Sequence, residues 1–490
     1  MDTEKGNTNN KKYGEYLMIT ATKTSSKNKS RPNERPGNVR VTLRQLLKEI
    51  KPVDFRKKSG LESHQELTQK HYLVIAIDEL INTALQHDWG LAINQEKVYV
   101  YNSMHWQQVE KDDLKMFLGI AAYKMGVKKF DAKFYLFRDK LVKQFISTAH
   151  MPTPDRPKEV TLINLKNGTY EITPEKRGLR EFRRNDFLKY QLPFNFDENA
   201  ECLKFMAYLN RVLPDESMQQ ILSEFLGYVF ISTQTLKLEK TLLLYGSGSN
   251  GKSVKFDITN ELFGKENISN FTLESLTDTN GYFRASLADK LLNYSSEISN
   301  RMNVDLFKQL VSGEPIEARQ IYGKPHMLEN YAKLMFNCNE LPLPTQHKDA
   351  YFRRFIIIPF EQKISPEEQN PRLAQEIISE ELPGVFNWVL AGLERLLKNG
   401  RFTESEKVNA IINKYRTETD TVRHFLNENK LSPGVEREMH LKEMYINYID
   451  FCKDEYSKAH GKTSFSNYLR ELGFHIKKIN TGMVISLSKQ

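Results

Sequence analysis

Residues 241–264 read TLLLYGSGSNGKSVKFDITNELFG, and they contain the pattern that decides the fold. A short apolar segment comes first, a glycine-rich loop follows, and a segment of helical character completes the stretch. Residues 246–253 match G-x-x-x-x-G-K-[ST] at every fixed position. Glycines allow backbone N–H groups to wrap a phosphate, and the N-terminus of the following helix favours the same anion. The stretch therefore predicts a phosphate-binding loop between a strand and a helix.

The loop also predicts the ligand. In such a loop the lysine, here Lys252, reaches the β- and γ-phosphates, and the hydroxyl of Ser253 binds Mg²⁺. The expected ligands are therefore ATP and Mg²⁺. The residues predicted to contact the nucleotide are Gly246, Ser247, Gly248, Ser249, Asn250, Gly251, Lys252 and Ser253.

Three more apolar segments follow the loop, at residues 290–296, 333–338 and 355–360. Helical stretches separate the first of them. Short buried strands that alternate with helices are typical of a mostly parallel sheet with crossover connections. We therefore expect an α/β P-loop NTPase core.

Polar residues flank these strands. Glu297 ends the first segment and could polarise an attacking water, although Ser296 stands where an Asp is usual. Asn339 ends the second segment, where an amide can orient that water and sense the γ-phosphate. Arg353 and Arg354 precede the third, and arginine suits the charge of a transferring phosphoryl group. Each signal is weak alone, but their order and close spacing favour a hydrolysis site.

The rest of the chain suggests further parts. Residues 1–70 hold 16 Lys and Arg against 8 Asp and Glu, which accounts for +8 of the net charge of +9. A basic arm of this kind suits a phosphate backbone, and a solvated tail is the alternative. We expect five regions: a largely flexible arm at 1–70 with a short helix near 41–50, an α-rich domain at 71–235, the ATPase core at 236–365, a helical extension at 366–428 and a winged-helix-like domain at 429–490.

Composition excludes several classes of protein. Three cysteines in 490 residues exclude a disulfide scaffold and a four-cysteine zinc site. Cys202, Cys338 and Cys452 are expected to be reduced bystanders, and no histidine spacing indicates a zinc enzyme. No apolar run approaches the roughly 18 residues of a membrane span, and the polar N-terminus does not resemble a signal peptide. We expect a cytoplasmic protein.

From about residue 97 onward, the sequence resembles the superfamily 3 helicases, in the branch of phage or plasmid primase-type and poxvirus-type proteins. The most specific stretch is FKQLVSGEPIEARQIYGKPHMLENYAKLMFNCNELP, residues 307–342, followed by the double arginine and IIIPFE. The resemblance implies an AAA+-like core and a β-hairpin that projects into the channel of a ring. NLKNGTYEI, LSEFLGYVF and PGVFNWVLAGLERLLKNGRFT also look like flanks of the helicase domain in that family.

The resemblance also implies roles for single residues. Glu297 would be the catalytic glutamate, also placed near Mg²⁺ directly or through water, and Asn339 would be the sensor. Arg354 would be the arginine finger acting on a neighbouring subunit, with Arg353 as its close rival. The DNA contacts of the hairpin would be Lys324, His326 and Arg319. Relatives often carry a primase domain ahead of the helicase, and the polar residues before about residue 71 predict no primase activity.

Together these observations predict an ATP-dependent DNA helicase and replication initiator of a mobile genetic element or virus. The expected assembly is a homo-oligomeric ring, a hexamer by the family's pattern, with single-stranded DNA in its channel. The winged helix and the basic arm would bind duplex DNA, and host replication proteins are further candidate partners. The alternative is an ATP-dependent origin-binding or helicase-loading protein without unwinding activity. A small-molecule P-loop kinase is a third reading, against which the basic arm and the length of the chain argue.

Overall fold

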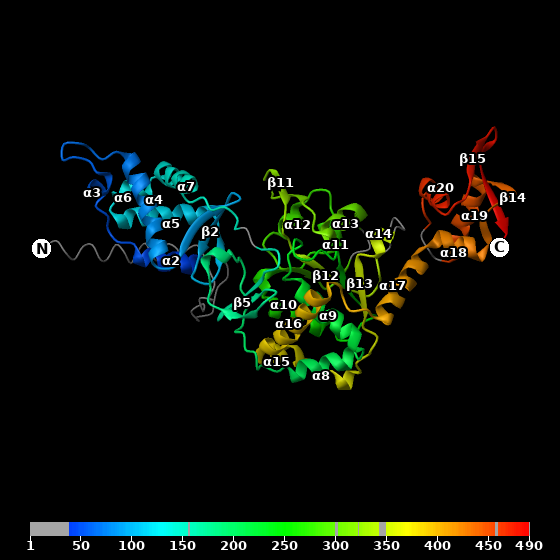
Figure 1. Ribbon diagram of the computed structural model, residues 1–490. Coiled ribbons are helices and arrows are strands. Elements are labelled where there is room, and N and C mark those ends of the chain that lie inside the picture. Colours follow the sequence, from blue (N-terminus) through cyan, green and yellow to red (C-terminus); the bar gives the residue numbers. More distant parts are fainter. Residues whose placement is uncertain are drawn as a thin grey trace. The chain divides into compact units, whose positions relative to one another are not determined.

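The computed structural model describes residues 39–154, 157–298, 302–321, 323–342, 349–455 and 459–489. The chain divides into two compact units, Met1–Phe196 and Asp197–Gln490 (Figure 1). Among the described residues, none of the helices has the length and apolar character that crossing a membrane requires. The five regions expected from the sequence remain predictions.

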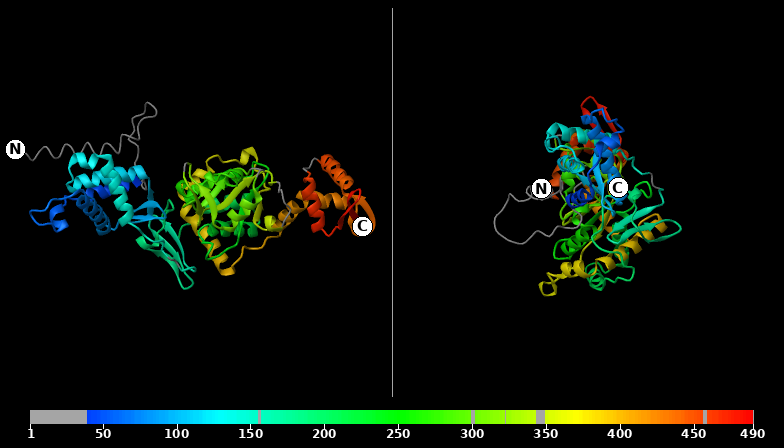
Figure 2. Two further views of the ribbon diagram at one scale, coloured as in Figure 1. Left: turned by 90° about the horizontal axis from the view of Figure 1, so that it is seen from above. Right: turned by 90° about the vertical axis from the view of Figure 1, so that its left-hand side faces the viewer.

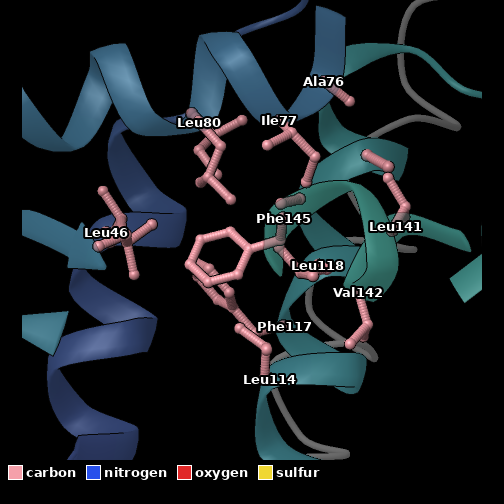
Figure 3. Close-up of a cluster of buried hydrophobic side chains, with 14 of the residues drawn as sticks. Leu46, Ala76, Ile77, Leu80, Leu114, Phe117, Leu118, Leu141, Val142 and Phe145 are labelled. Atoms are coloured by element: carbon pink, nitrogen blue, oxygen red, sulfur yellow. The ribbon is translucent and has the colours of Figure 1, made fainter. Parts of the chain in front are cut away.

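Four helices build the core of the first unit, as Figure 3 shows. Phe117, Leu141 and Phe145 are fully buried there and pack with Leu46 and Leu80. Apolar residues spaced three and four apart give each helix one buried face. The helices are α2 (Val39–Glu49), α4 (Gln69–Gln86), α5 (Lys111–Met125) and α7 (Tyr135–Thr148), joined by the short α3 (Phe55–Ser59) and α6 (Lys129–Lys133).

The structure corrects the expectation of a flexible arm that extends to residue 70. Residues 1–38 lie outside the described residues. The predicted helix near 41–50 is confirmed as α2, but Leu43 and Leu46 of α2 are buried in the core of the first unit. Burying these leucines offsets the entropy of ordering the segment. Ordered structure therefore begins by residue 39 and not near residue 71.

Two small antiparallel sheets complete the first unit, and Figure 2 shows β4–β6 extending as a ribbon from its helices. A two-residue turn at Lys166 and Asn167 joins β4 to β5. Helix α4 ends at Gln86, and Gly90 begins a strand. One sheet holds β1 (Gly90–Asn94), β2 (Lys97–Tyr101) and β3 (Trp106–Val109), and the other holds β4 (Thr161–Leu165), β5 (Gly168–Ile172) and β6 (Arg177–Arg180).

The second unit is built on a five-stranded sheet in the order β13-β7-β12-β9-β8. All of its pairings are parallel, as predicted. Both faces of this sheet are covered. Leu243 packs with the buried side chains of α11 and α13 on one face, and Phe256 of α10 lies 4.9 Å from the ring of Tyr294 on the other. The strands are β7 (Thr241–Tyr245), β8 (Ile268–Ser269), β9 (Leu292–Ser295), β12 (Lys333–Cys338) and β13 (Phe355–Pro359).

Helices and one hairpin surround this sheet. β10 (Ile316–Arg319) and β11 (Pro325–Leu328) form an antiparallel two-stranded ribbon. The helices before and around the sheet are α8 (Leu203–Val212), α9 (Glu216–Tyr228), α10 (Lys252–Phe263), α11 (Leu273–Leu276), α12 (Tyr282–Ala285), α13 (Val304–Ser312) and α14 (Asp349–Phe352). The helices after it are α15 (Leu373–Glu380), α16 (Leu382–Asn399) and α17 (Glu406–Thr419).

The C-terminal residues combine three helices with an antiparallel sheet in the order β14-β16-β15. A two-residue turn at Asn480 and Thr481 joins β15 to β16, and β14 pairs with the other edge of β16. The C-terminal residues have a hydrophobic core of their own, which includes Phe425, Tyr448 and Phe465. The elements are α18 (Thr421–Glu428), β14 (Leu431–His440), α19 (Leu441–Asp454), α20 (Lys462–Glu471), β15 (Ile476–Ile479) and β16 (Gly482–Lys489).

Candidate active site

The carboxyl edge of the parallel sheet brings together three of the predicted features. Cys338 at the end of β12 pairs with Tyr245 at the end of β7, so Asn339 continues level with Gly246 of the loop. On the other side of β12, Phe336 pairs with Ser295 at the end of β9, and Glu297 follows two residues later. Adjacent strands lie about 4.8 Å apart, so these segments are neighbours. The phosphate loop, Glu297 and Asn339 therefore share one edge.

The phosphate loop adopts a conformation that needs its glycines. Gly248 and Gly251 have φ angles of 101° and 84°, in the left-handed region. A Cβ on Gly251 would also lie 2.7 Å from Val212 Cγ1 of α8. Ser253, on the first turn of α10, is exposed, as are Ser247 and Ser249. The loop therefore leaves its hydroxyls and the start of α10 accessible to a ligand.

The Lys252 ammonium is held inside the loop. Its Nζ donates to the carbonyl of Gly246 at 2.5 Å and to Oδ1 of Asn250 at 3.1 Å. Burial lowers the pKa of Lys252 from its ordinary value. A phosphate would supply the negative charge that this buried ammonium lacks within the loop. The donor set therefore fits a nucleotide phosphate.

Neighbouring elements fix the loop in place. The Tyr208 hydroxyl of α8 donates to the carbonyl of Gly251 at 2.8 Å. The Asn250 amide donates to the carbonyl of Phe360 at 2.9 Å, just after β13. The N–H of Ile364 donates to the carbonyl of Ser249 at 2.9 Å. Nothing in the sequence indicated Tyr208, because α8 reads as an ordinary amphipathic helix.

The polar side chains at the edge are accessible. Glu297 and Asn339 are both exposed, and so is Glu340, a second carboxylate at the end of β12. Within the described residues, no group of three or more His, Cys, Asp and Glu side chains could hold a metal by itself. Mg²⁺ is commonly held by one or two protein oxygens together with phosphate oxygens and water. The Ser253 hydroxyl and the Glu297 carboxylate fit that ion.

The double arginine lies at the opposite edge of the sheet. The N–H of Thr241, at the start of β7, donates to the carbonyl of Arg354 at 2.8 Å, whereas the phosphate loop follows the end of the same strand. Five residues of strand span roughly 16 Å. Arg353 and Arg354 are thus separated from the loop of their own chain by the length of β7.

The two arginines differ in exposure. Arg354 Nη2 contacts Ser312 Oγ at 2.9 Å and Glu239 Oε2 at 3.3 Å, and its side chain is 9% exposed. Arg353 also reaches Glu239 at 3.3 Å, but its side chain is 58% exposed. Burial lowers the pKa of Arg354. Of the two arginines, only Arg353 exposes much of its side chain to solvent.

The three residues predicted to contact DNA lie on or beside the β10–β11 hairpin. Arg319, Lys324 and His326 are all exposed, and Arg319 lies over the ring of Tyr282 with 5.6 Å between guanidinium carbon and ring centroid. The sequence reading missed two apolar neighbours, Ile321 and Met327, which are 69% and 57% exposed. The sequence does not predict this exposure, because apolar residues are expected to be buried in a core.

The three cysteines are free thiols and are buried. Burial raises the pKa of Cys338 to about 12 and that of Cys202 to about 11. Thiols with such values stay protonated at neutral pH and are poor nucleophiles.

Comparison with known proteins connects this geometry to a family. Residues 78–214 match the family described as D5 N terminal like, and residues 244–354 match a family of unknown function, DUF5906. The putative helicase 121R of Invertebrate iridescent virus 3 is 24% identical over 340 residues, and the putative helicase 184R of Invertebrate iridescent virus 6 is 22% identical over 372 residues. The chain is therefore similar to proteins of the D5 type and to putative viral helicases.

The matches cover a limited part of each viral relative. They span 60% and 64% of this chain, but 35% and 37% of the two relatives. Among solved structures, the apo C-terminal region of NrS-1 covers 87% of this chain with 14% sequence identity and a TM-score of 0.48. The second matched region, residues 244–354, contains Lys252, Glu297 and Asn339.

A buried lysine beside the loop was also missed by the sequence reading. Lys255 of α10 is fully buried, and its Nζ has no hydrogen-bond partner. It lies 5.2 Å from the ring centroid of Phe205 and 5.6 Å from that of Trp388. Burial lowers the pKa of Lys255 from 10.5 to about 7. The charged form of Lys255 therefore destabilises the fold.

Replacing Lys255 by Met is expected to raise the melting temperature of the second unit by about 2 °C or more at pH 6. Between pH 7 and 10.5 the unfolded chain binds a proton at Lys255 that the folded chain does not, so this residue makes stability rise with pH. The advantage of Lys255→Met should therefore shrink toward pH 9. Thermal melts at both pH values test this, with the exposed Lys398→Met on α16 as the control. An equal effect of both variants would contradict the account.

Proposed function

We propose that this chain is an ATP-dependent DNA helicase of a virus or mobile genetic element, which acts in replication and translocates on DNA as a homo-oligomeric ring. One observation carries the proposal. The phosphate loop, Glu297 and Asn339 share one edge of the sheet, whereas Arg353 lies at the other. An arginine on the far edge can serve a nucleotide only if a second subunit presents it.

The site divides the work of hydrolysis between its residues. Backbone N–H groups of the loop and the Lys252 ammonium would bind the phosphates of ATP. The Ser253 hydroxyl and Glu297 carboxylate would hold Mg²⁺, which would neutralise phosphate charge. Glu297 accepts a proton from the attacking water, and the Asn339 amide orients that water. The exposed Arg353 of a neighbouring subunit stabilises charge on the transferring phosphoryl group. We propose Arg353 for this role in place of Arg354, since Arg354 is held within its own subunit.

Three parts of the chain would contact DNA. The β10–β11 hairpin presents Arg319, Lys324 and His326 to a single strand in the channel. The C-terminal residues 429–490 would form a winged-helix module for duplex DNA, supported by helices packed on an antiparallel sheet. The basic N-terminal arm would add sequence-independent contacts to the phosphate backbone.

Strand displacement distinguishes this function from that of a helicase loader. The full chain with ATP should separate a forked duplex into single strands, and omission of ATP should abolish the separation. Native electrophoresis measures both. Stable ATP-dependent binding to the fork without strand separation would favour the origin-binding or loading role.

Replacing Lys324 by Ala is expected to lower the rate of unwinding by about tenfold or more, because an exposed ammonium at the hairpin contacts the DNA backbone. The stimulation of ATP hydrolysis by single-stranded DNA should fall with it. Lys398→Ala, at an exposed position on α16, is the matched control. Equal unwinding by Lys324→Ala and the wild type would remove the hairpin from the mechanism.

A further inference from the structure

The first unit exposes a cluster of aromatic rings on α6 and α7. Phe130 is 86% exposed, Tyr135 is 60% exposed and Phe134, which joins the two helices, is 50% exposed. The rings of Phe134 and Tyr135 meet edge to face with centroids 5.2 Å apart. The opposite face of α7 is fully used in the core, where Phe137, Leu141, Val142 and Phe145 are buried. The outward rings therefore add nothing to the core of the unit.

Exposed lysines lie on the same two helices as the rings. The exposed side chains of α6, α7 and the residue before them include five lysines: Lys128, Lys129, Lys133, Lys140 and Lys143. Two acidic residues lie among them, and Asp139 contacts Lys115 at 2.5 Å. We call the three rings and five lysines the α6–α7 surface. It combines exposed π faces with an excess of positive charge.

We propose that the α6–α7 surface binds single-stranded nucleic acid, with bases stacked on Phe130, Phe134 and Tyr135 and phosphates beside the lysines. Proteins bind single-stranded nucleic acid through exposed aromatic rings within a basic surface, because every base has a flat face that can stack on a ring. Duplex DNA hides those faces. A second copy of the chain placed symmetrically on this surface would bring the same lysines together, and that contact is electrostatically unfavourable.

A recess beside the rings indicates that bases stack on the rings and do not insert into the protein. It is lined by Gly119, Ile120, Tyr123, Lys129 and Arg138, among others, and its volume is about 10 Å³. That is room for one water molecule and not for a base. Bases would therefore lie on the rings. This inference goes beyond the proposed function, because the surface contains no residue of the nucleotide loop or of the β10–β11 hairpin.

Photo-crosslinking of the full chain, carried out without ATP, identifies the residues that contact the nucleic acid. The probe is an oligothymidine in which 5-iodouracil replaces thymine, and its oligouridine counterpart tests RNA. After irradiation and tryptic digestion, the expected adducts lie on the peptides of residues 130–133 and 134–138, with one or both probes. Adducts confined to residues 197–490 would overturn the proposal, and they would leave the helicase function standing.

Affinity measurements supply a second test. The double variant Phe130→Ala/Phe134→Ala should bind the oligothymidine about tenfold more weakly or worse and lose the adducts. Leu203→Ala, which also removes an exposed apolar side chain, is the control and should bind as the wild type does. If the double variant keeps its affinity but changes the oligomeric mass in sedimentation, the surface is an interface between subunits and the proposal fails.

Discussion

Replacing Glu297 by Gln is expected to slow ATP hydrolysis by about 10²–10⁴-fold while ATP binding is retained. The substitution keeps the size of the side chain and removes the carboxylate that we propose accepts a proton from water. Glu297 is exposed, two residues past the end of β9, and β12 places it beside the phosphate loop. Hydrolysis is measured by phosphate release, and binding by equilibrium titration with a fluorescent ATP analogue.

Two further variants separate Glu297 from other carboxylates. Glu266→Gln changes an exposed carboxylate just before β8, at the opposite edge of the sheet, and should hydrolyse ATP as the wild type does. Glu340→Gln changes the second exposed carboxylate at the carboxyl edge. A large loss in Glu340→Gln with normal hydrolysis in Glu297→Gln would transfer the role of base to Glu340.

Replacing Arg353 by Ala is expected to reduce hydrolysis by about 10³-fold or more, as loss of an arginine finger does. Because we propose that the arginine serves the neighbouring subunit, mixing should restore activity. In a ring that contains both variants, some sites are intact. These are the sites where the phosphate loop of an Arg353→Ala subunit faces the Arg353 side chain of a Lys252→Ala subunit. With random mixing, about one quarter of the interfaces are intact.

The outcomes of mixing are distinct. Recovery of hydrolysis from two inactive variants shows that Arg353 acts between subunits. A mixture that stays inactive, although sedimentation shows mixed rings, would contradict that role. Arg354→Ala is the comparison. Since Arg354 contacts Ser312 and Glu239 within its own subunit, its loss should lower the melting temperature as well as activity.

The α/β core with its parallel sheet was predictable because its signals are local. The apolar segment before the glycine loop and the three later ones are confirmed as β7, β9, β12 and β13. In a parallel sheet the carboxyl ends of neighbouring strands meet at one edge, so the positions of Glu297 and Asn339 followed from their order in the chain. The difference in exposure between Arg353 and Arg354 did not follow from the sequence, because the contact residues Glu239 and Ser312 come from distant segments of the chain.

The misread elements depended on tertiary contacts. Gly90 permits a close approach within the β1–β3 sheet, because a Cβ there would lie 2.9 Å from Cη2 of Trp106. β14 contains Pro433 and Gly434, which favour turns, and its pairing with β16 is interrupted between Pro433 and Arg437. Helix α2 is ordered by the leucines that it buries. None of these contacts is visible in a local pattern.

The central claim is that the loop around Lys252 drives a motor that responds to DNA. ATP hydrolysis with and without single-stranded DNA, for the wild type and for Lys252→Ala, tests it most directly. The account predicts that single-stranded DNA stimulates hydrolysis by the wild type, and that Lys252→Ala loses hydrolysis under both conditions. Hydrolysis that is indifferent to DNA, or that survives in Lys252→Ala, would contradict the account.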